Sequence, residues 1–142
     1  MKTSEVIYLG NLRTESTHLR SGEKIITDAP VDNKGKGEAF SPTDLTATSL
    51  GNCMITTMAI AANTHDIPIG EAIAEVLKVM ANDPRRIVAI EVDMYLQSVP
   101  YTDKQKAILE NSSLTCPVAR SLHPDLKQIV RFHWIDEKAT NL

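Results

Sequence analysis

A run of twenty residues without a charged side chain, residues 45–64, constrains this sequence more than any other feature. The run is long enough to cross a bilayer as a helix. However, it contains five threonines, one serine, two asparagines and one glycine, a composition too polar for lipid. We therefore predict no membrane span. We expect a helix buried inside a protein, either in the centre of the fold or at a subunit interface.

The residues just before this run mark where the helix begins. Ser41 suits the N-cap because its hydroxyl can accept a backbone N–H, and Pro42 at the first helical position loses no needed donor. Asp44 follows Ser41 at the spacing of a capping box, with Asp in place of Glu. We expect the helix to continue to about Thr64, with residues 65–68 as its stop.

The remaining segments are short, and most of them are extended. A loop is predicted over residues 28–40, a hairpin turn at 82–84, and shorter helices after Thr102 and Cys116. Hydrophobic alternation and turn residues predict six strands, at residues 5–9, 12–19, 24–27, 72–80, 87–96 and 128–134. This order of elements favours an α+β fold over a doubly wound parallel sheet.

Size and charge narrow the classes of function. A chain of 142 residues with 42% hydrophobic side chains is expected to form a single domain, residues 1–142. The formal net charge is −3 with both signs scattered, so no basic block supports a nucleic-acid partner. The N-terminus has no apolar run of signal-peptide length, which predicts a cytoplasmic protein. The four histidines are dispersed, and we expect neither a metal nor a bound cofactor.

The two cysteines, Cys53 and Cys116, are 63 positions apart. A static disulfide is disfavoured in a reducing cytoplasm, so they are either free core residues or a redox pair. Cys53 lies too far into its helix to gain much from the helix dipole, so a low thiol pKa would need a cation from another segment. Cys116 precedes Pro117 and is a candidate N-cap, where unpaired N–H groups favour the thiolate.

A peroxide-reducing pair needs an activated thiolate, a second thiol nearby and a cation that keeps the first one ionised. The candidate cations are Arg13, Arg20 and Arg120, although an ordinary surface charge is the simpler interpretation of each. His123 is close to Cys116 in sequence, but a histidine at the end of a helix is the simpler interpretation. Inert core thiols remain the structural alternative.

Two motifs in the chain resemble those of the OsmC/Ohr family. FSPTDLTATSLGNCMITTMAI, residues 40–60, resembles the family's helix start with a cysteine about ten residues on. TCPVARSLHPDL, residues 115–126, resembles the second signature, in which Cys-Pro begins a short helix. ITDAPVDNKGKGEAFSPTDL and NDPRRI are similar to segments of one OsmC-like subgroup. The resemblance spans nearly the entire chain.

The resemblance implies an OsmC-like fold, in which a strongly curved antiparallel sheet surrounds a long central buried helix. It implies an intertwined homodimer with active sites at the dimer interface. It also implies that Cys53 is the peroxidatic thiol and Cys116 the resolving thiol. Organic hydroperoxides are the expected substrates, and hydrogen peroxide is a further candidate. The reductant in the family is a dithiol, often protein-bound lipoyl, and no prosthetic group is bound.

The sequence departs from the best-studied peroxidases of the family at one position. They place a glutamate ten residues before the first cysteine, paired with an arginine that stabilises the thiolate, and here Thr43 occupies that position. We predict that Arg20, in preference to Arg13, lowers the Cys53 pKa, and that Glu38 or Asp44 orients it. The alternative is an OsmC-like protein that binds a small molecule and has little peroxidase activity. A Cys53 pKa near its ordinary value would favour that alternative.

Overall fold

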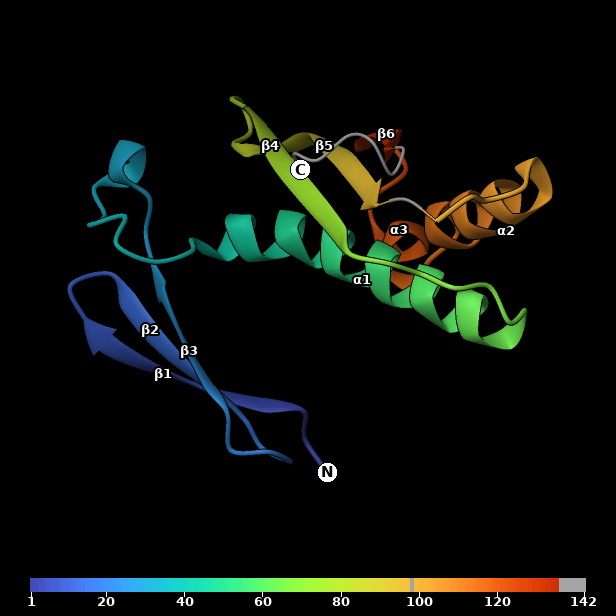
Figure 1. Ribbon diagram of the computed structural model, residues 1–142. Coiled ribbons are helices and arrows are strands. Elements are labelled where there is room, and N and C mark those ends of the chain that lie inside the picture. The colour runs from blue at the N-terminus through green and yellow to red at the C-terminus, as the bar shows by residue number, and fades with distance from the viewer. Residues whose placement is uncertain (98, 136–142) are drawn as a thin grey trace. The chain divides into compact units, whose positions relative to one another are not determined.

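The computed structural model describes residues 1–97 and 99–135. Its contacts divide the chain into two compact units, Met1–Thr46 and Ala47–Leu142, and Figure 1 labels their elements. Both helices and strands are present in the predicted order, so the α+β class is confirmed. The single domain over residues 1–142 stays a prediction. The tail at 136–142, predicted to be loose, lies outside the described residues.

The first unit contains an antiparallel sheet with the strand order β1-β2-β3. Its strands are β1 (Ser4–Gly10), β2 (Arg13–His18) and β3 (Lys24–Asp28), each close to its predicted range. Figure 1 shows the three strands twisting along their length. Large apolar side chains of this unit are exposed, among them Val6, Ile7, Tyr8, Leu9, Leu12, Leu19 and Ile25. Exposed apolar side chains gathered on one sheet are typical of a surface that another surface covers.

The predicted loop at residues 28–40 is closed by backbone hydrogen bonds, and it contains one short 3-10 helix, η1 (Val31–Asn33). The N–H of Asp28 donates to the carbonyl oxygen of Phe40 at 3.1 Å, which joins the two ends of the loop. A Cβ atom at Gly35 would lie 1.7 Å from the carbonyl oxygen of Ala29, so this turn accepts only glycine. The closed loop returns residue 38 to the end of β3.

The long helix α1 (Pro42–Thr64) has the predicted bounds. Ser41 Oγ accepts the N–H of Asp44 at 3.0 Å, and Asp44 Oδ2 accepts the N–H of Ser41 at 2.9 Å. The predicted capping box is therefore confirmed, with Asp in the place of Glu. By length and composition alone α1 could cross a membrane, a test that buried core helices also pass.

One face of α1 is buried in the hydrophobic core of the second unit. The buried positions recur every three or four residues, as one helix face requires, and are Ala47, Leu50, Gly51, Met54, Met58 and Ala62. On the other side of the helix, Asn52, Thr56 and Ile60 are exposed. The second unit therefore covers α1 on one face.

The sheet of the second unit has the order β4-β5-β6, formed by β4 (Ala72–Ala81), β5 (Arg86–Gln97) and β6 (Lys127–Ile135). The predicted hairpin is confirmed, because β4 and β5 are antiparallel. The predicted alternation on β5 is confirmed as well, with Ile90, Val92, Met94 and Leu96 at most 1% exposed.

The strand β6 departs from the predicted antiparallel sheet, because it runs parallel to β5. A parallel neighbour needs a long crossover connection. Here the crossover contains the helices α2 (Asp103–Leu114) and α3 (Pro117–Ser121), which bring the chain back to the end of the sheet where β5 began. Figure 1 shows α2 and α3 on this connection.

Gly51 lies on the face of α1 that packs against β4. A Cβ atom at this position would be 2.9 Å from Cγ2 of Val76 and 3.5 Å from Cβ of Ala74. We expect Gly51→Val to lower the free energy of unfolding by about 1–3 kcal/mol, because the larger side chain overpacks this contact. Denaturant unfolding measures the change, and Asn52→Val at the exposed neighbouring position is the matched control. Equal losses in the two variants would contradict the proposed tight contact.

Candidate active site

The two cysteines lie on separate elements of the second unit. Cys53 is half-buried in the N-terminal half of α1, at the border of its packed face. Cys116 is fully buried and is the N-cap of α3, with Pro117 at the first helical position. Its Sγ accepts the backbone N–H of Ala119 at 3.4 Å. The predicted N-cap role of Cys116 is thus confirmed.

The side chains of the two cysteines meet in the hydrophobic core. Both are free thiols, and they lie close enough for each to shift the pKa of the other. Both residues belong to the cluster in which α1 packs against the sheet and the crossover. The fold therefore makes neighbours of two sulfur atoms that are 63 positions apart in sequence.

The surroundings of the two thiols affect their ionisation in opposite directions. Burial raises the pKa of Cys53, but the backbone N–H of Val118, the Cys116 thiol and the Thr57 hydroxyl outweigh it, so the pKa is lowered. Burial raises the pKa of Cys116, and the neighbouring Cys53 raises it further. The N–H of Ala119 lowers this pKa, but its effect is smaller than theirs combined. Cys53 therefore ionises first, while Cys116 keeps its proton.

Two side chains near Cys116 in sequence have other partners. Arg120 Nε donates to the carbonyl oxygen of Thr115 at 2.9 Å. His123 is exposed, and its Nδ1 accepts the N–H of Asp125 at 3.0 Å, which fits a histidine at a helix end. Neither side chain contributes to the lowered pKa of Cys53. In the described part of this unit, that pKa is lowered by uncharged donors.

The first unit contains a cluster of one arginine and two carboxylates. Arg13 Nε and Nη2 donate to the two carboxylate oxygens of Asp28 at 2.7 and 2.8 Å, a bidentate pair. Arg13 Nη2 also donates to Glu38 Oε2 at 3.2 Å. The Asp28 side chain is 1% exposed, whereas that of Glu38 is 65% exposed. Asp28 thus anchors the arginine from inside, and Glu38 covers it from the solvent side.

Strand register and loop closure explain the cluster. Antiparallel pairing of β2 with β3 places Arg13 directly opposite Asp28, where cross-strand side chains meet. The closed loop then brings Glu38 back, and its backbone N–H donates to Asp28 Oδ2 at 3.1 Å. Hydrogen bonding from Arg13 lowers the pKa of the Asp28 carboxyl against the effect of burial.

The other predicted site residues lie elsewhere in the first unit. Arg20 is exposed in the turn between β2 and β3, and the arginine that contacts Glu38 is Arg13. Asp44 completes the cap of α1. Thr43 Oγ1 lies 3.2 Å from Ser41 Oγ in the same helix start.

Comparisons with known proteins show the family to which this chain belongs. The family model described as OsmC-like protein matches residues 35–129. The chain belongs to the OsmC-like protein family. No curated protein matches it.

Solved structures extend the likeness over nearly the full chain. A putative osmotic stress induced and detoxification response protein from Psychrobacter arcticus 273-4 is 53% identical, with a TM-score of 0.88 over 94% of this chain and 96% of that one. An organic hydroperoxide resistance protein OsmC from Legionella pneumophila, described as a predicted redox protein, is 14% identical, with a TM-score of 0.70 and coverage of 94% and 98%.

A putative organic hydroperoxide resistance protein from Vibrio cholerae, with captopril bound in one of its active sites, is also similar in structure. It is 14% identical, with a TM-score of 0.64 over 94% of this chain and 92% of that one. At this identity the likeness shows the fold alone. Together with the family match, these structures confirm the OsmC-like fold.

Three residues, one in the arginine cluster and two beside Cys53, were not predicted from the sequence. Asp28 stood in a segment predicted as a loop, and only the β2–β3 register shows that it faces Arg13. Val118 acts through its backbone N–H, which carries no sequence signal. Thr57 lies four residues after Cys53 on α1, a spacing that places both on one helix face and could have identified it.

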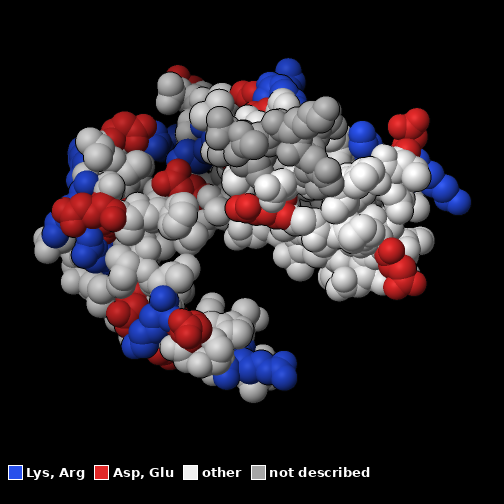
Figure 2. Space-filling view, viewed as in Figure 1, with Lys and Arg blue, Asp and Glu red and all other residues white. Residues whose placement is uncertain are grey.

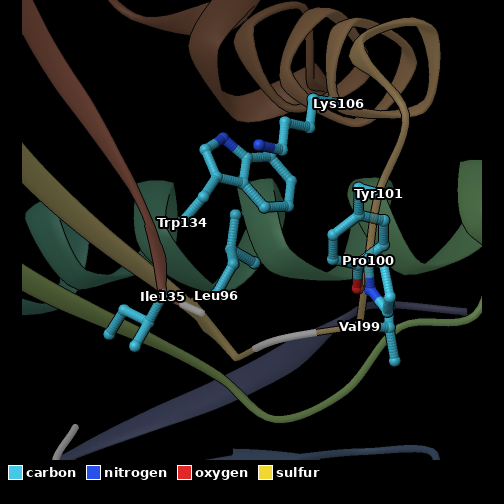
Figure 3. Close-up of a pocket in the computed structure, with 7 residues that line it drawn as sticks. All are labelled: Leu96, Val99, Pro100, Tyr101, Lys106, Trp134 and Ile135. Carbon is cyan, nitrogen blue, oxygen red and sulfur yellow. The ribbon is translucent and has the colours of Figure 1, made fainter. Parts of the chain in front are cut away.

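A separate small cavity of about 100 Å³ lies in the second unit of the OsmC-like chain, and Figure 3 shows its lining. Tyr101 packs edge-on against Trp134 at 5.0 Å, and Lys106 Nζ lies 5.6 Å from the centre of the Trp134 ring. Trp134 Nε1 donates to Glu110 Oε1 at 2.8 Å. These side chains contact one another, so we interpret the cavity as a gap in the packing between α2 and β6.

Other kinds of site have little support in the described residues. Within residues 1–97 and 99–135, no group of three His, Cys, Asp or Glu side chains could hold a metal ion. Figure 2 shows basic and acidic side chains interspersed on the face in view.

On β5 and β6, Asp93 bridges Arg131 and His133 at 3.2 and 2.9 Å. His133 is therefore a satisfied sheet residue.

The Asp28 carboxyl should make the free energy of unfolding of the chain depend on pH in the acidic range. Its pKa is lowered in the folded chain, so its contribution is complete above the ordinary Asp value of about 3.9 and is lost as the pH falls through the folded pKa. We expect Asp28→Asn to be less stable at neutral pH and to lose less stability on acidification. Denaturant unfolding at successive pH values tests this, with exposed Asp66→Asn as control. Parallel pH curves for wild type and Asp28→Asn would contradict it.

Proposed function

We propose that this chain is a cysteine-based peroxidase that reduces organic hydroperoxides with a dithiol as the electron donor. The observation that carries the proposal is the contact between Cys53 and Cys116, in which the first thiol has a lowered pKa and the second a raised one. A lowered Cys53 pKa favours catalysis over the alternative of a binding protein with unactivated thiols. The names of the solved relatives support hydroperoxides as the substrate class.

In the first step the Cys53 thiolate attacks the hydroperoxide. A sulfur–oxygen bond forms, the O–O bond breaks, and the alkoxide leaves and takes up a proton to become an alcohol. Cys53 is oxidised to a sulfenic acid, and the hydroperoxide is reduced. Cys53 suits this step because it is the more exposed of the two thiols.

In the second step Cys116 resolves the sulfenic acid. Its sulfur bonds to Cys53, the sulfur–oxygen bond breaks, and the hydroxide leaves as water with the proton from Cys116. The charge of Cys53 contributes to the raised pKa of Cys116. That contribution ends once Cys53 is oxidised, so Cys116 becomes easier to ionise when its attack is needed.

A dithiol then returns the protein to its reduced form. One thiolate of the donor attacks the disulfide, and its second thiol completes the exchange, so that the donor leaves as a disulfide. Cys116 is fully buried, which favours attack on the Cys53 sulfur. A lipoyl-type dithiol fits this requirement, and the proposed reaction consumes no bound cofactor.

The proposal includes an intertwined homodimer that works in the cytoplasm, with active sites at the dimer interface. Two observations support the dimer: the exposed apolar side chains of the first sheet and the uncovered face of α1. Both are typical of surfaces that are buried in an obligate assembly. We propose no nucleic-acid partner and no membrane partner.

We assign to Arg13 the positive charge that was predicted at Arg20. Arg13 contacts Glu38, the carboxylate predicted to orient the arginine, and it is held by Asp28 as well. An arginine held by two carboxylates has a defined orientation, whereas Arg20 lies exposed in a turn. In this proposal Glu38 takes the place of the glutamate that Thr43 replaces.

Loss of either sulfur should produce a different defect. Cys53→Ser is expected to abolish consumption of an alkyl hydroperoxide in the presence of a dithiol donor, because it lacks the attacking thiolate. Cys116→Ser is expected to react once and then to accumulate sulfinic and sulfonic acid at Cys53, which mass spectrometry detects. Turnover by Cys53→Ser at the wild-type rate would contradict the proposed function.

Removal of one arginine at a time tests the assignment of the charge. Arg13→Gln is expected to raise the Cys53 pKa by about one unit, because an opposite charge favours the ionised form. Arg20→Gln changes the net charge equally and should leave the pKa where it was. The pH dependence of Cys53 alkylation measures both. The reverse pattern would return the role to Arg20.

A further inference from the structure

Several threonines on α1 have hydroxyl groups with defined partners. Thr46, Thr56 and Thr64 each donate to the backbone carbonyl oxygen four residues earlier, over 2.8–3.2 Å. The hydroxyl of Thr57 also contacts the residue four positions earlier, but its partner there is the Cys53 sulfur, 3.9 Å from Thr57 Oγ1. This hydroxyl is therefore directed at the reactive thiol.

A hydroxyl beside a cysteine can accept from the S–H group or donate to the thiolate, and only donation favours ionisation. Once Cys53 is ionised its sulfur can only accept, so the Thr57 hydroxyl then donates to it, and the Thr57 contact lowers the Cys53 pKa together with the Val118 N–H and the Cys116 thiol. In the described part of the Ala47–Leu142 unit, these three uncharged groups face Cys53, and no charged side chain acts on it. Cys116 is thus the titratable group beside it.

We propose that Thr57 is a positioning residue for Cys53, whose hydroxyl donates to the sulfur and holds it as a thiolate ready to attack. This inference rests on the proposed peroxidase function. The Val118 donor belongs to the backbone, and the Cys116 donor is consumed in the second step. Thr57 is the donor that a substitution can remove while both sulfurs and the backbone stay in place.

The hydrogen bond stabilises the thiolate before the reaction more than it stabilises the product. As the sulfur–oxygen bond forms, the negative charge passes to the departing alkoxide, and the hydroxyl loses its charged acceptor. Thr57 therefore acts on how much thiolate is present at neutral pH. A thiolate of higher pKa is intrinsically the better nucleophile, so the ionised form of a variant without the hydroxyl should react at least as fast.

The test compares Thr57→Val, which removes the hydroxyl at nearly equal volume, with Thr57→Ser, which restores it. Thr56→Val, at the next position on α1, is the matched control, because the Thr56 hydroxyl donates to Asn52 and not to sulfur. The readout is the pH dependence of iodoacetamide alkylation at Cys53, followed by mass spectrometry of its peptide. Circular dichroism confirms that each variant is folded. Alkylation needs no peroxide, so it tests the Thr57 contact separately from the proposed function.

For Thr57→Val we expect the alkylation midpoint to rise by about half to one pH unit, with an unchanged or up to about threefold higher rate at the alkaline plateau. Thr57→Ser and Thr56→Val should keep the wild-type midpoint. Hydroperoxide turnover of Thr57→Val near neutral pH should fall about two- to fourfold.

An unchanged midpoint in Thr57→Val overturns the inference, and so does a raised midpoint that Thr57→Ser fails to restore. A raised and restored midpoint, in a chain whose wild type consumes no hydroperoxide, supports the Thr57 contact and overturns the peroxidase.

Discussion

Close packing of α1 against the β4–β5 hairpin is the contact on which the arrangement of the second unit depends. The helix turns one face of small and flexible apolar residues to the sheet, and Gly51 lets its backbone approach Val76. Cys53 lies at the border of that face. The crossover to β6 then carries Cys116 and the N–H of Val118 to the same place. A looser helix would separate the sulfur atoms without any change in the residues that carry the chemistry.

The arginine cluster in the first unit is organised by a different constraint. Its bonds are made by one edge of the guanidinium, since Nε and Nη2 supply all the donors to Asp28 and Glu38. The buried carboxylate holds this edge through strand pairing, while the exposed one arrives on a loop that glycine allows to close. A rigid strand thus sets the position of the arginine, and a surface loop supplies its second partner.

Local features of the fold could be predicted from the sequence because they depend on neighbouring residues. The cap at Ser41 and Asp44, the alternation along β5 and the N-cap at Cys116 all follow from short-range chemistry. The direction of β6 could not be predicted in this way, because side chains alternate between the two faces in parallel and antiparallel strands alike. The contact of Arg13 with Glu38 depends on register and loop closure together, and spacing along the chain encodes neither. The Val118 N–H beside Cys53 could not be predicted either, since a backbone donor leaves no signal in the sequence.

The placement of Cys116 on the crossover also has a mechanical consequence. A covalent bond from Cys116 to Cys53 on α1 would enclose the 62 residues between them, including the whole β4–β5 hairpin and α2. Closing a loop of that length restricts the unfolded chain by roughly 4 kcal/mol in the entropic description. Each formation of a Cys53–Cys116 disulfide would therefore also cross-link the helix, the sheet and the crossover and make them harder to unfold. Each reduction of that disulfide would remove this added stability.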